Sequence, residues 1–152
     1  MELEVTSEPG APRGMDGRKP LDIEIFTLCD AAADYQGRLN ILGVFDTIFA
    51  PKLPVKHPFC SVALRMRFQR TERGPHRLLL DIVDYDGKPV IQPLEGTFNV
   101  EIPGNSQIAS ANLVLILGQL EFKNYGEYAI NLAIDGRQEA SLPFWVREPP
   151  KS

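Results

Sequence analysis

The stretch Leu117–Ile130, with the sequence LGQLEFKNYGEYAI, decides the fold of this chain. Its spacing indicates a strand, a turning corner and a second strand that crosses from one sheet to another. From Tyr128 to Ile134 large apolar side chains occupy every second position, which is the period of a half-buried strand, and Asp135-Gly136 then gives a hairpin turn signal. The stretch therefore predicts a β-sandwich.

Length and composition fit one small domain with many turns. The chain has 152 residues, which is enough to bury a core that stands without disulfides or metal. Its 13 prolines and 12 glycines favour short strands joined by turns over long helices. We expect residues 1–20 to form a disordered tail, residues 21–148 a single β-sandwich domain, and residues 149–152 a short C-terminal tail.

Charge and hydropathy exclude several classes of protein. A net charge of −4 argues against a wholly basic nucleic-acid-binding protein, so we do not expect nucleic acid as a partner. No stretch reaches the ~18 to 20 apolar residues that a membrane-spanning helix needs, and the N-terminus lacks the pattern of a secretory signal. We therefore expect a cytoplasmic location without membrane attachment. Cys29 and Cys60 lie at apolar-patterned positions, which predicts free, buried thiols.

Apolar patterning predicts seven to nine short strands and no convincing helix. Cys60–Phe68 alternates most clearly in the N-terminal half. The run Leu39–Phe49 has no polar face, which predicts a central strand covered on both sides, and Gly43 within it marks a bulge or a close backbone approach. The segment Asp30–Gly37 is too short for a stable helix and predicts a loop or short turn.

Prolines and turn residues place the ends of the strands. A proline-rich loop that contains His57 is expected to follow the Leu39–Phe49 run. Asp84–Lys88 predicts a tight hairpin turn. Pro143 predicts that the last strand lies at the edge of a sheet, because proline cannot donate to a strand ladder.

The corner resembles the tyrosine corner of immunoglobulin-like folds. Leu117, Leu120, Gly126 and Tyr128 stand at the expected offsets, whereas Ile130 replaces the usual second cysteine. The resemblance implies an Ig-like topology in which the Tyr128 ring is buried and its hydroxyl bonds to the backbone. Gly126 and Leu120 are then structural residues of the same corner.

A second resemblance covers Leu21 to Val146. It rests on LCDA at 28–31, GRLNILGVFD at 37–46, DGK at 86–88, PLEG at 93–96 and IDG at 134–136. Together these motifs are similar to a bacterial family of small single-domain proteins of unknown function. The resemblance implies a bacterial, non-secreted protein, and it implies no activity, cofactor or catalytic residue.

The strongest charge asymmetry lies in residues 65–77. This segment carries five arginines against one acidic residue, Glu72, in a chain whose net charge is −4. Guanidinium groups hold phosphates or carboxylates through paired hydrogen bonds, so the segment is a candidate interaction surface. A solvated outer face that blocks edge-to-edge aggregation explains the charges equally simply. The candidates are Arg65, Arg67, Arg70, Arg73 and Arg77.

No other cluster identifies a reaction or a metal. His57 lies near Cys60 in sequence, but the cysteine belongs to the apolar row of its strand, which argues against a catalytic thiol. Two sets of aspartates offer oxygen ligands without the loop that a calcium site requires. The sets are Asp30, Asp34 and Asp46, and Asp81, Asp84 and Asp86.

The leading hypothesis from the sequence is a non-enzymatic protein-interaction module without a cofactor. Its partner is another protein or a second copy, bound through edge strands or loop ends. The alternative is a small-ligand binder or enzyme whose site is built from the inter-strand loops 30–38 and 50–58.

Overall fold

The computed structural model describes residues 21–151 and shows an all-β protein. The only helical element among these residues is one 3₁₀ turn, η1 (Arg70–Glu72). The strands are β1 (Asp22–Tyr35), β2 (Arg38–Val44), β3 (Thr47–Phe49), β4 (Val55–Gln69), β5 (Gly74–Asp84), β6 (Leu94–Val100), β7 (Ile108–Phe122), β8 (Gly126–Ile134) and β9 (Arg137–Arg147). The predicted fold class and strand number are confirmed. The predicted tail, residues 1–20, lies outside the described residues.

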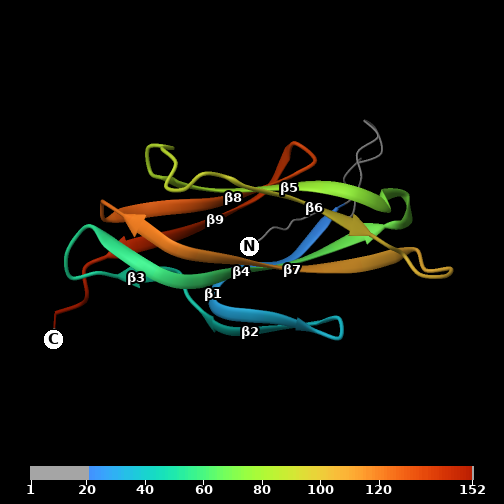
Figure 1. Ribbon diagram of the computed structural model, residues 1–152, viewed down its shortest axis with the longest axis horizontal. Helices are drawn as coiled ribbons and strands as arrows, with labels where there is room; N and C mark the ends of the chain where they lie inside the picture. Colours follow the sequence, from blue (N-terminus) through green and yellow to red (C-terminus); the bar gives the residue numbers. More distant parts are fainter. Residues whose placement is uncertain (1–20, 152) are drawn as a thin grey trace, which may run out of the picture.

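The strands form two sheets that pack face to face (Figure 1). One has the order β2-β1-β4-β7 and the other the order β3-β9-β8-β5-β6. All pairs are antiparallel except β3 with β9. The alternation predicted from sequence supplies the core, because every second residue of β4 and β8 points between the sheets. These residues are Cys60, Val62, Leu64, Met66 and Phe68 of β4, and Tyr128, Ile130, Leu132 and Ile134 of β8.

The corner at Leu117–Ile130 crosses between the sheets as predicted, since β7 belongs to one sheet and β8 to the other. Tyr128 is 4% exposed and its hydroxyl donates to the carbonyl oxygen of Asn124 at 2.6 Å. The ring stacks on Phe144 and meets Phe122 edge-on. Gly126 adopts a φ of 132°, a conformation that favours glycine. The predicted buried ring and bonded hydroxyl are confirmed.

The first hairpin differs from the sequence prediction. β1 pairs with β4 only as far as Cys29, and from there to Tyr35 it pairs with β2. Residues 30–44 therefore form a two-stranded arm at one end of the four-stranded sheet, and this arm lies below β4 and β7 in Figure 1. At its tip the Asn112 side-chain amide of β7 donates to the carbonyl oxygen of Gly37 at 3.1 Å. The loop or short turn predicted over Asp30–Gly37 is thus wrong for Asp30–Tyr35, which stay extended, and only Gln36 and Gly37 form a turn.

The arm lies over small side chains on the outer face of β1 and β4. Cys29, Ser61 and Ala63 are almost completely buried, yet none belongs to the core between the sheets. Gly43 has a φ of 68°, and a Cβ there would overlap the Asp30 carboxylate, so the glycine is explained by close packing of a side chain against its backbone.

The run Leu39–Phe49 does not form a central strand. It divides into β2 and β3, both at the edges of their sheets. The run lacks a polar face because β2 carries apolar residues on both of its sides. Only one side packs against the molecule, and Leu42 and Val44 on the other side are 70% and 63% exposed.

The expected edge position of the last strand holds for part of β9. Pro143 pairs with Ala129 of β8, and β3 reaches only Trp145 to Arg147 on the other side of β9. Pro143 therefore has a strand partner on one side only within residues 21–151, which suits a residue that cannot donate.

Candidate interaction surface

One side of the sandwich is open, and we call the surface of β6 and β7 on that side the open side. β6 and β7 are the last strands of their sheets, and both lie toward the viewer in Figure 1. A groove of about 320 Å³ lies between Phe98–Glu101 and Ser110–Leu113. Leu94 and Leu115 pack against the core from these two strands but remain only partly buried. The core is therefore incompletely covered along the open side.

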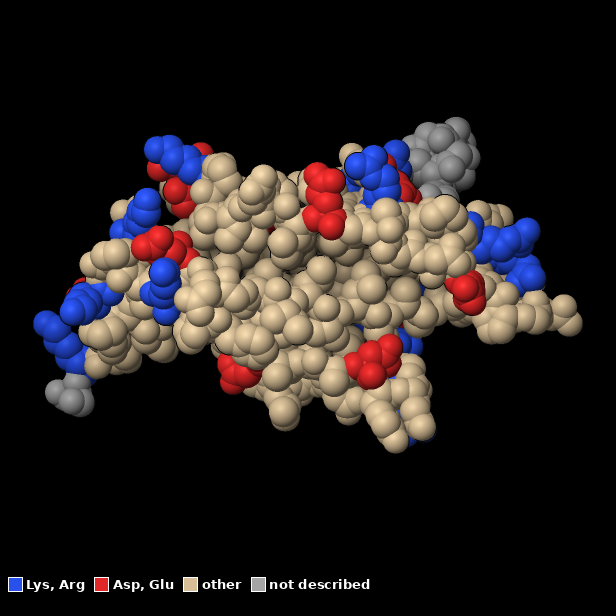
Figure 2. Space-filling view, viewed as in Figure 1, with Lys and Arg blue, Asp and Glu red and all other residues tan. Residues whose placement is uncertain are grey.

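β7 is an unusually unprotected edge strand. Its segment Ile108–Gln119 contains no charged residue and no proline. β4 is its only strand partner in the part of the chain that the structure describes. Backbone groups directed away from β4 are therefore available to another strand. Figure 2 shows a band of uncharged side chains across the middle of this side, with acidic groups above and below the band and most lysines and arginines toward its two ends.

The other three edges carry the protection that β7 lacks. β6 contains Glu95 and is flanked by Pro93 and Pro103, whereas β3 has only 3 residues. β2 begins with the exposed Arg38 and is distorted at Gly43, which has a φ of 68°. Short strands, charges and prolines are the usual means by which proteins prevent edge-to-edge pairing. β7 is thus the edge most suited to accept a strand.

Sequence reasoning identified the apolar strand over Ile108–Leu117 but not its position at an edge. The absence of charge over Ile108–Gln119 is visible in the sequence and is the signal that marks such an edge. Exposure supports it, because Ile108 and Ile116 are 50% and 63% exposed on the outer side of β7.

Two of the five candidate arginines share one acidic partner. The Arg65 Nε donates to Glu24 Oε1 at 2.9 Å, and its Nη1 donates to Asn112 Oδ1 at 2.8 Å. Arg67 forms an ion pair with the other carboxylate oxygen of Glu24. Arg65 and Arg67 therefore belong to a network that ties β1, β4 and β7 together on the outer face of their sheet.

The other three arginines lie apart from that network. Arg70 donates to the carbonyl oxygens of Gly104 and Ser106 at 2.9 and 2.8 Å and so fastens the β6–β7 turn. Arg73 is exposed directly after η1. Arg77 projects from β5 in the five-stranded sheet. The arginines do not converge on one site, and binding of a partner by any of them stays a prediction.

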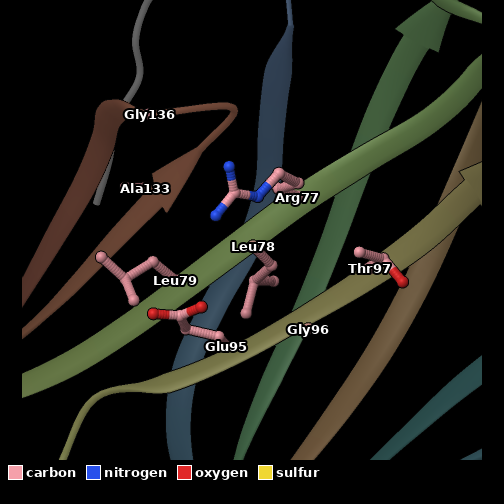
Figure 3. Close-up of a pocket in the computed structure, with 8 residues that line it drawn as sticks. All are labelled: Arg77, Leu78, Leu79, Glu95, Gly96, Thr97, Ala133 and Gly136. Atoms are coloured by element: carbon pink, nitrogen blue, oxygen red, sulfur yellow. The ribbon is translucent and has the colours of Figure 1, made fainter.

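Arg77 borders a hollow of about 380 Å³ on the outer face of the five-stranded sheet (Figure 3). Gly96 and Ala133 leave the space above the strands open. In Figure 3 the Glu95 carboxylate lies beside Leu79, while the Arg77 guanidinium reaches toward the β8–β9 turn. The polar groups therefore point in different directions and do not converge on a common ligand position.

The alternative site in loops 30–38 and 50–58 is not formed. Residues 30–38 belong mainly to the arm, and β4 begins at Val55, so the second loop shrinks to Ala50–Pro54. The hydroxyl of Tyr125 donates to the carbonyl oxygen of the buried Ala50 at 2.8 Å and holds that short loop against the sandwich. These segments offer no group of polar side chains around a closed pocket.

Both cysteines are free and buried, as predicted. Burial raises the pKa of the Cys60 thiol to about 11, which disfavours the reactive thiolate at neutral pH. His57 lies in β4, not in a loop, and its ring packs against Phe45. Burial lowers the pKa of His57, so its neutral form is favoured. These environments agree with the interpretation that Cys60 is structural.

The aspartate sets do not form a metal site. No group of three or more potential metal-ligating side chains gathers within residues 21–151. Asp84 instead closes the predicted hairpin turn, where its Oδ1 accepts from the backbone N–H groups of Asp86 and Lys88 at 2.9 Å each.

Sequence reasoning missed the buried His76. Its Nδ1 lies 2.7 Å from Asp135 Oδ2 and its Nε2 lies 2.6 Å from the carbonyl oxygen of Glu72. Both ring nitrogens therefore lie within hydrogen-bond distance of an oxygen atom, one on a side chain and one on the backbone. His76 shares the inward row of β5 with Leu78 and Leu80, and that alternation is the signal that places it in the core.

Within residues 21–151 the structure defines the class of this chain as an all-β sandwich of two sheets, in which β7 is a free edge. The chain belongs to a family of unknown function, DUF6941, whose sequence pattern matches residues 24–147. This agrees with the predicted resemblance to an unknown-function family. No curated protein matches the chain. Among the described residues, no helix is long and apolar enough to cross a membrane.

The chain is also similar to parts of several solved structures. One of them is the alkylpurine DNA glycosylase AlkC of Pseudomonas fluorescens, bound to DNA containing an abasic site analog. The TM-score is 0.45 and the sequences are 10% identical. The match covers 86% of this chain and 31% of the glycosylase chain, so this chain spans less than a third of that protein. The likeness assigns no activity.

Proposed function

We propose that this chain is a non-enzymatic protein-interaction module that accepts an extended strand at the free edge of β7. The observation that carries the proposal is the charge-free segment Ile108–Gln119 beside a partly covered core. A strand added there gains backbone hydrogen bonds and also covers the half-buried apolar side chains of the open side.

The free backbone groups of β7 and the partly buried core side chains beside it favour the same position for the incoming strand. Along β7, Leu113 and Leu115 point toward the core, whereas Ile116 lies on the outer face. A neighbouring strand about 4.8 Å away reaches both sets of side chains, since successive residues of a strand point to opposite faces. The chemistry predicts an uncharged partner segment with apolar residues at alternate positions.

Photo-crosslinking tests this proposal directly. A photoreactive amino acid is placed at Ile116 in β7 or, as the control, at the exposed Gln138 in β9, and the full chain is irradiated in its source cells. We expect protein adducts from position 116 and none from position 138. Equal adducts from both positions, or none from position 116, contradict the proposal.

Other sequence-based expectations stay predictions. The Ig-like relationship is supported by the Tyr128 corner, whose hydroxyl bonds to the backbone in the expected way. We further propose that residues 21–148 form a single domain, that the source is bacterial, that the protein is cytoplasmic and that it does not bind nucleic acid. A fall in binding with rising salt is the expected sign of a nucleic-acid partner, and we expect no such binding at low salt.

A further inference from the structure

We propose that the strand accepted at the open side is β7 of a second copy of this chain, paired antiparallel about a two-fold axis. The inference rests on the proposed function and names its partner. Pairing of two identical edges is closed and self-complementary, so it yields a dimer and leaves neither β7 edge exposed. The two four-stranded sheets then form one continuous sheet.

The geometry of β7 sets the register of this pairing. Leu117 and Leu120 are both buried although they stand three residues apart, because Gln119 adopts a φ of 54° and shifts the alternation. The regular part of the edge is therefore Ile108–Gly118. A two-fold pairing that uses all of it is centred on Leu113.

In this register, outer-face residues of one copy lie opposite outer-face residues of the other, and core-side residues lie opposite core-side residues. Ile108 lies opposite Gly118 of the second copy, and Ser110 lies opposite its Ile116. On the core side, Leu113 meets its own counterpart and Ala111 meets Leu115. These core-side residues are only partly buried in one copy and become covered in the pair.

Charge favours a second copy over an unrelated strand. Proteins commonly select a particular partner by placing complementary charges across an interface, and Ile108–Gly118 has none. Self-pairing instead needs only that no like charges stand opposite each other, and a charge-free segment meets this condition in every row. The two-fold symmetry makes the two edges complementary without any charged pair.

The test uses two double variants of the full chain that differ only at position 116. Ser110→Glu/Ile116→Glu places two glutamates opposite each other across the two-fold axis, whereas Ser110→Glu/Ile116→Lys places glutamate opposite lysine. Ser110 and Ile116 are both exposed, so the changes disturb no core contact. Position 110 pairs with Arg67 of β4, so the glutamate introduced there has the same neighbour within one copy in both variants. Within one copy the two positions are about 20 Å apart and do not interact.

Masses are measured by light scattering over a range of concentrations. We expect twice 17.0 kDa for the wild type and for the Glu/Lys variant, and a mass halved to 17.0 kDa for the Glu/Glu variant. A wild-type chain that stays at 17.0 kDa, or two double variants of equal mass, overturns the inference. If the wild type is monomeric while position 116 still crosslinks to another protein, self-pairing fails and the proposed function stands. If position 116 crosslinks to nothing, both fail.

Discussion

Tyr128 shows how one side chain holds the connection between the two sheets. Its ring fills the core between Phe122 and Phe144, while its hydroxyl satisfies the Asn124 carbonyl in the corner itself. Burial also raises the pKa of this hydroxyl, so it stays a donor across the physiological range. At the scale of the residue, the corner combines apolar burial with a satisfied backbone acceptor.

The Tyr128→Phe variant tests the hydroxyl alone. It keeps the ring and removes one hydrogen bond, so the free energy of unfolding is expected to fall by about 1 kcal/mol. Urea denaturation measures the change. Tyr85→Phe is the matched control, because Tyr85 is 82% exposed and the same substitution there leaves stability unchanged. Equal effects at the two positions argue against the corner bond.

The two thiols are expected to resist alkylation in the native state. Cys29 and Cys60 are fully buried, and burial raises the pKa of both, so little thiolate forms at neutral pH. Iodoacetamide followed by mass spectrometry measures the labelling. The native chain stays unmodified at pH 7, and the urea-unfolded chain takes up two labels. Rapid modification of native Cys60 argues against its burial.

His76 is a polar residue on which the core depends. His76→Leu keeps an apolar side chain in place but removes the ring nitrogens that lie within hydrogen-bond distance of Asp135 and of the Glu72 carbonyl. We expect the free energy of unfolding to fall by about 1 to 2 kcal/mol, the net contribution of one or two hydrogen bonds. Thermal and urea unfolding measure this loss. Arg77→Leu, at an exposed neighbouring position, is the control and is expected to leave stability nearly unchanged.

At the scale of the element, the arm formed by residues 30–44 depends on contacts with the sheet that it covers. A two-stranded hairpin is marginal in water when it stands alone. Here small side chains beneath the arm allow close packing, and the Asn112–Gly37 hydrogen bond holds its tip. The close approach of Gly43 to Asp30 fixes the two strands of the arm relative to each other.

Gly43→Ala tests that approach. The added Cβ overlaps the Asp30 side chain in a backbone conformation that alanine disfavours, so the loss of stability is expected to exceed about 1 kcal/mol. Gly104→Ala is the control, because Gly104 also has a positive φ but faces open space. Hydrogen exchange is expected to accelerate in β2 for the Gly43 variant. The Asp30→Ala change added to Gly43→Ala is expected to restore part of the stability; no recovery rules out the overlap as the cause.

At the scale of the whole molecule, alternation predicted the sandwich but not the order of its strands. The rows of β4 and β8 are visible in the sequence because one side of each strand faces the core. The prediction of a central strand over Leu39–Phe49 was wrong because this run carries apolar residues on both sides, which is also the pattern of a central strand. The open side was missed for a related reason. An edge is a property of neighbours, and periodicity along one strand does not record them.

The candidate site was predictable only in part for the same physical reason. The charge in residues 65–77 is plain in the sequence, but the structure sends Arg65 and Arg77 to different sheets. The groove between β6 and β7 joins segments whose proximity depends on the crossing of the chain between sheets. Composition locates charges, whereas the topology decides which of them meet.

The position of β7 also shapes how the chain folds. β4 pairs with β1 and with β7, two segments far from each other in sequence, so the sheet is completed only after long loops have closed. Until then the charge-free strand is exposed on both edges and is prone to aggregate. We expect refolding yield to fall as chain concentration rises, and Ser110→Glu/Ile116→Glu to restore it, as turbidity after dilution from urea reports. The segment that we propose as a binding edge is thus also the segment from which aggregation during folding is expected to start.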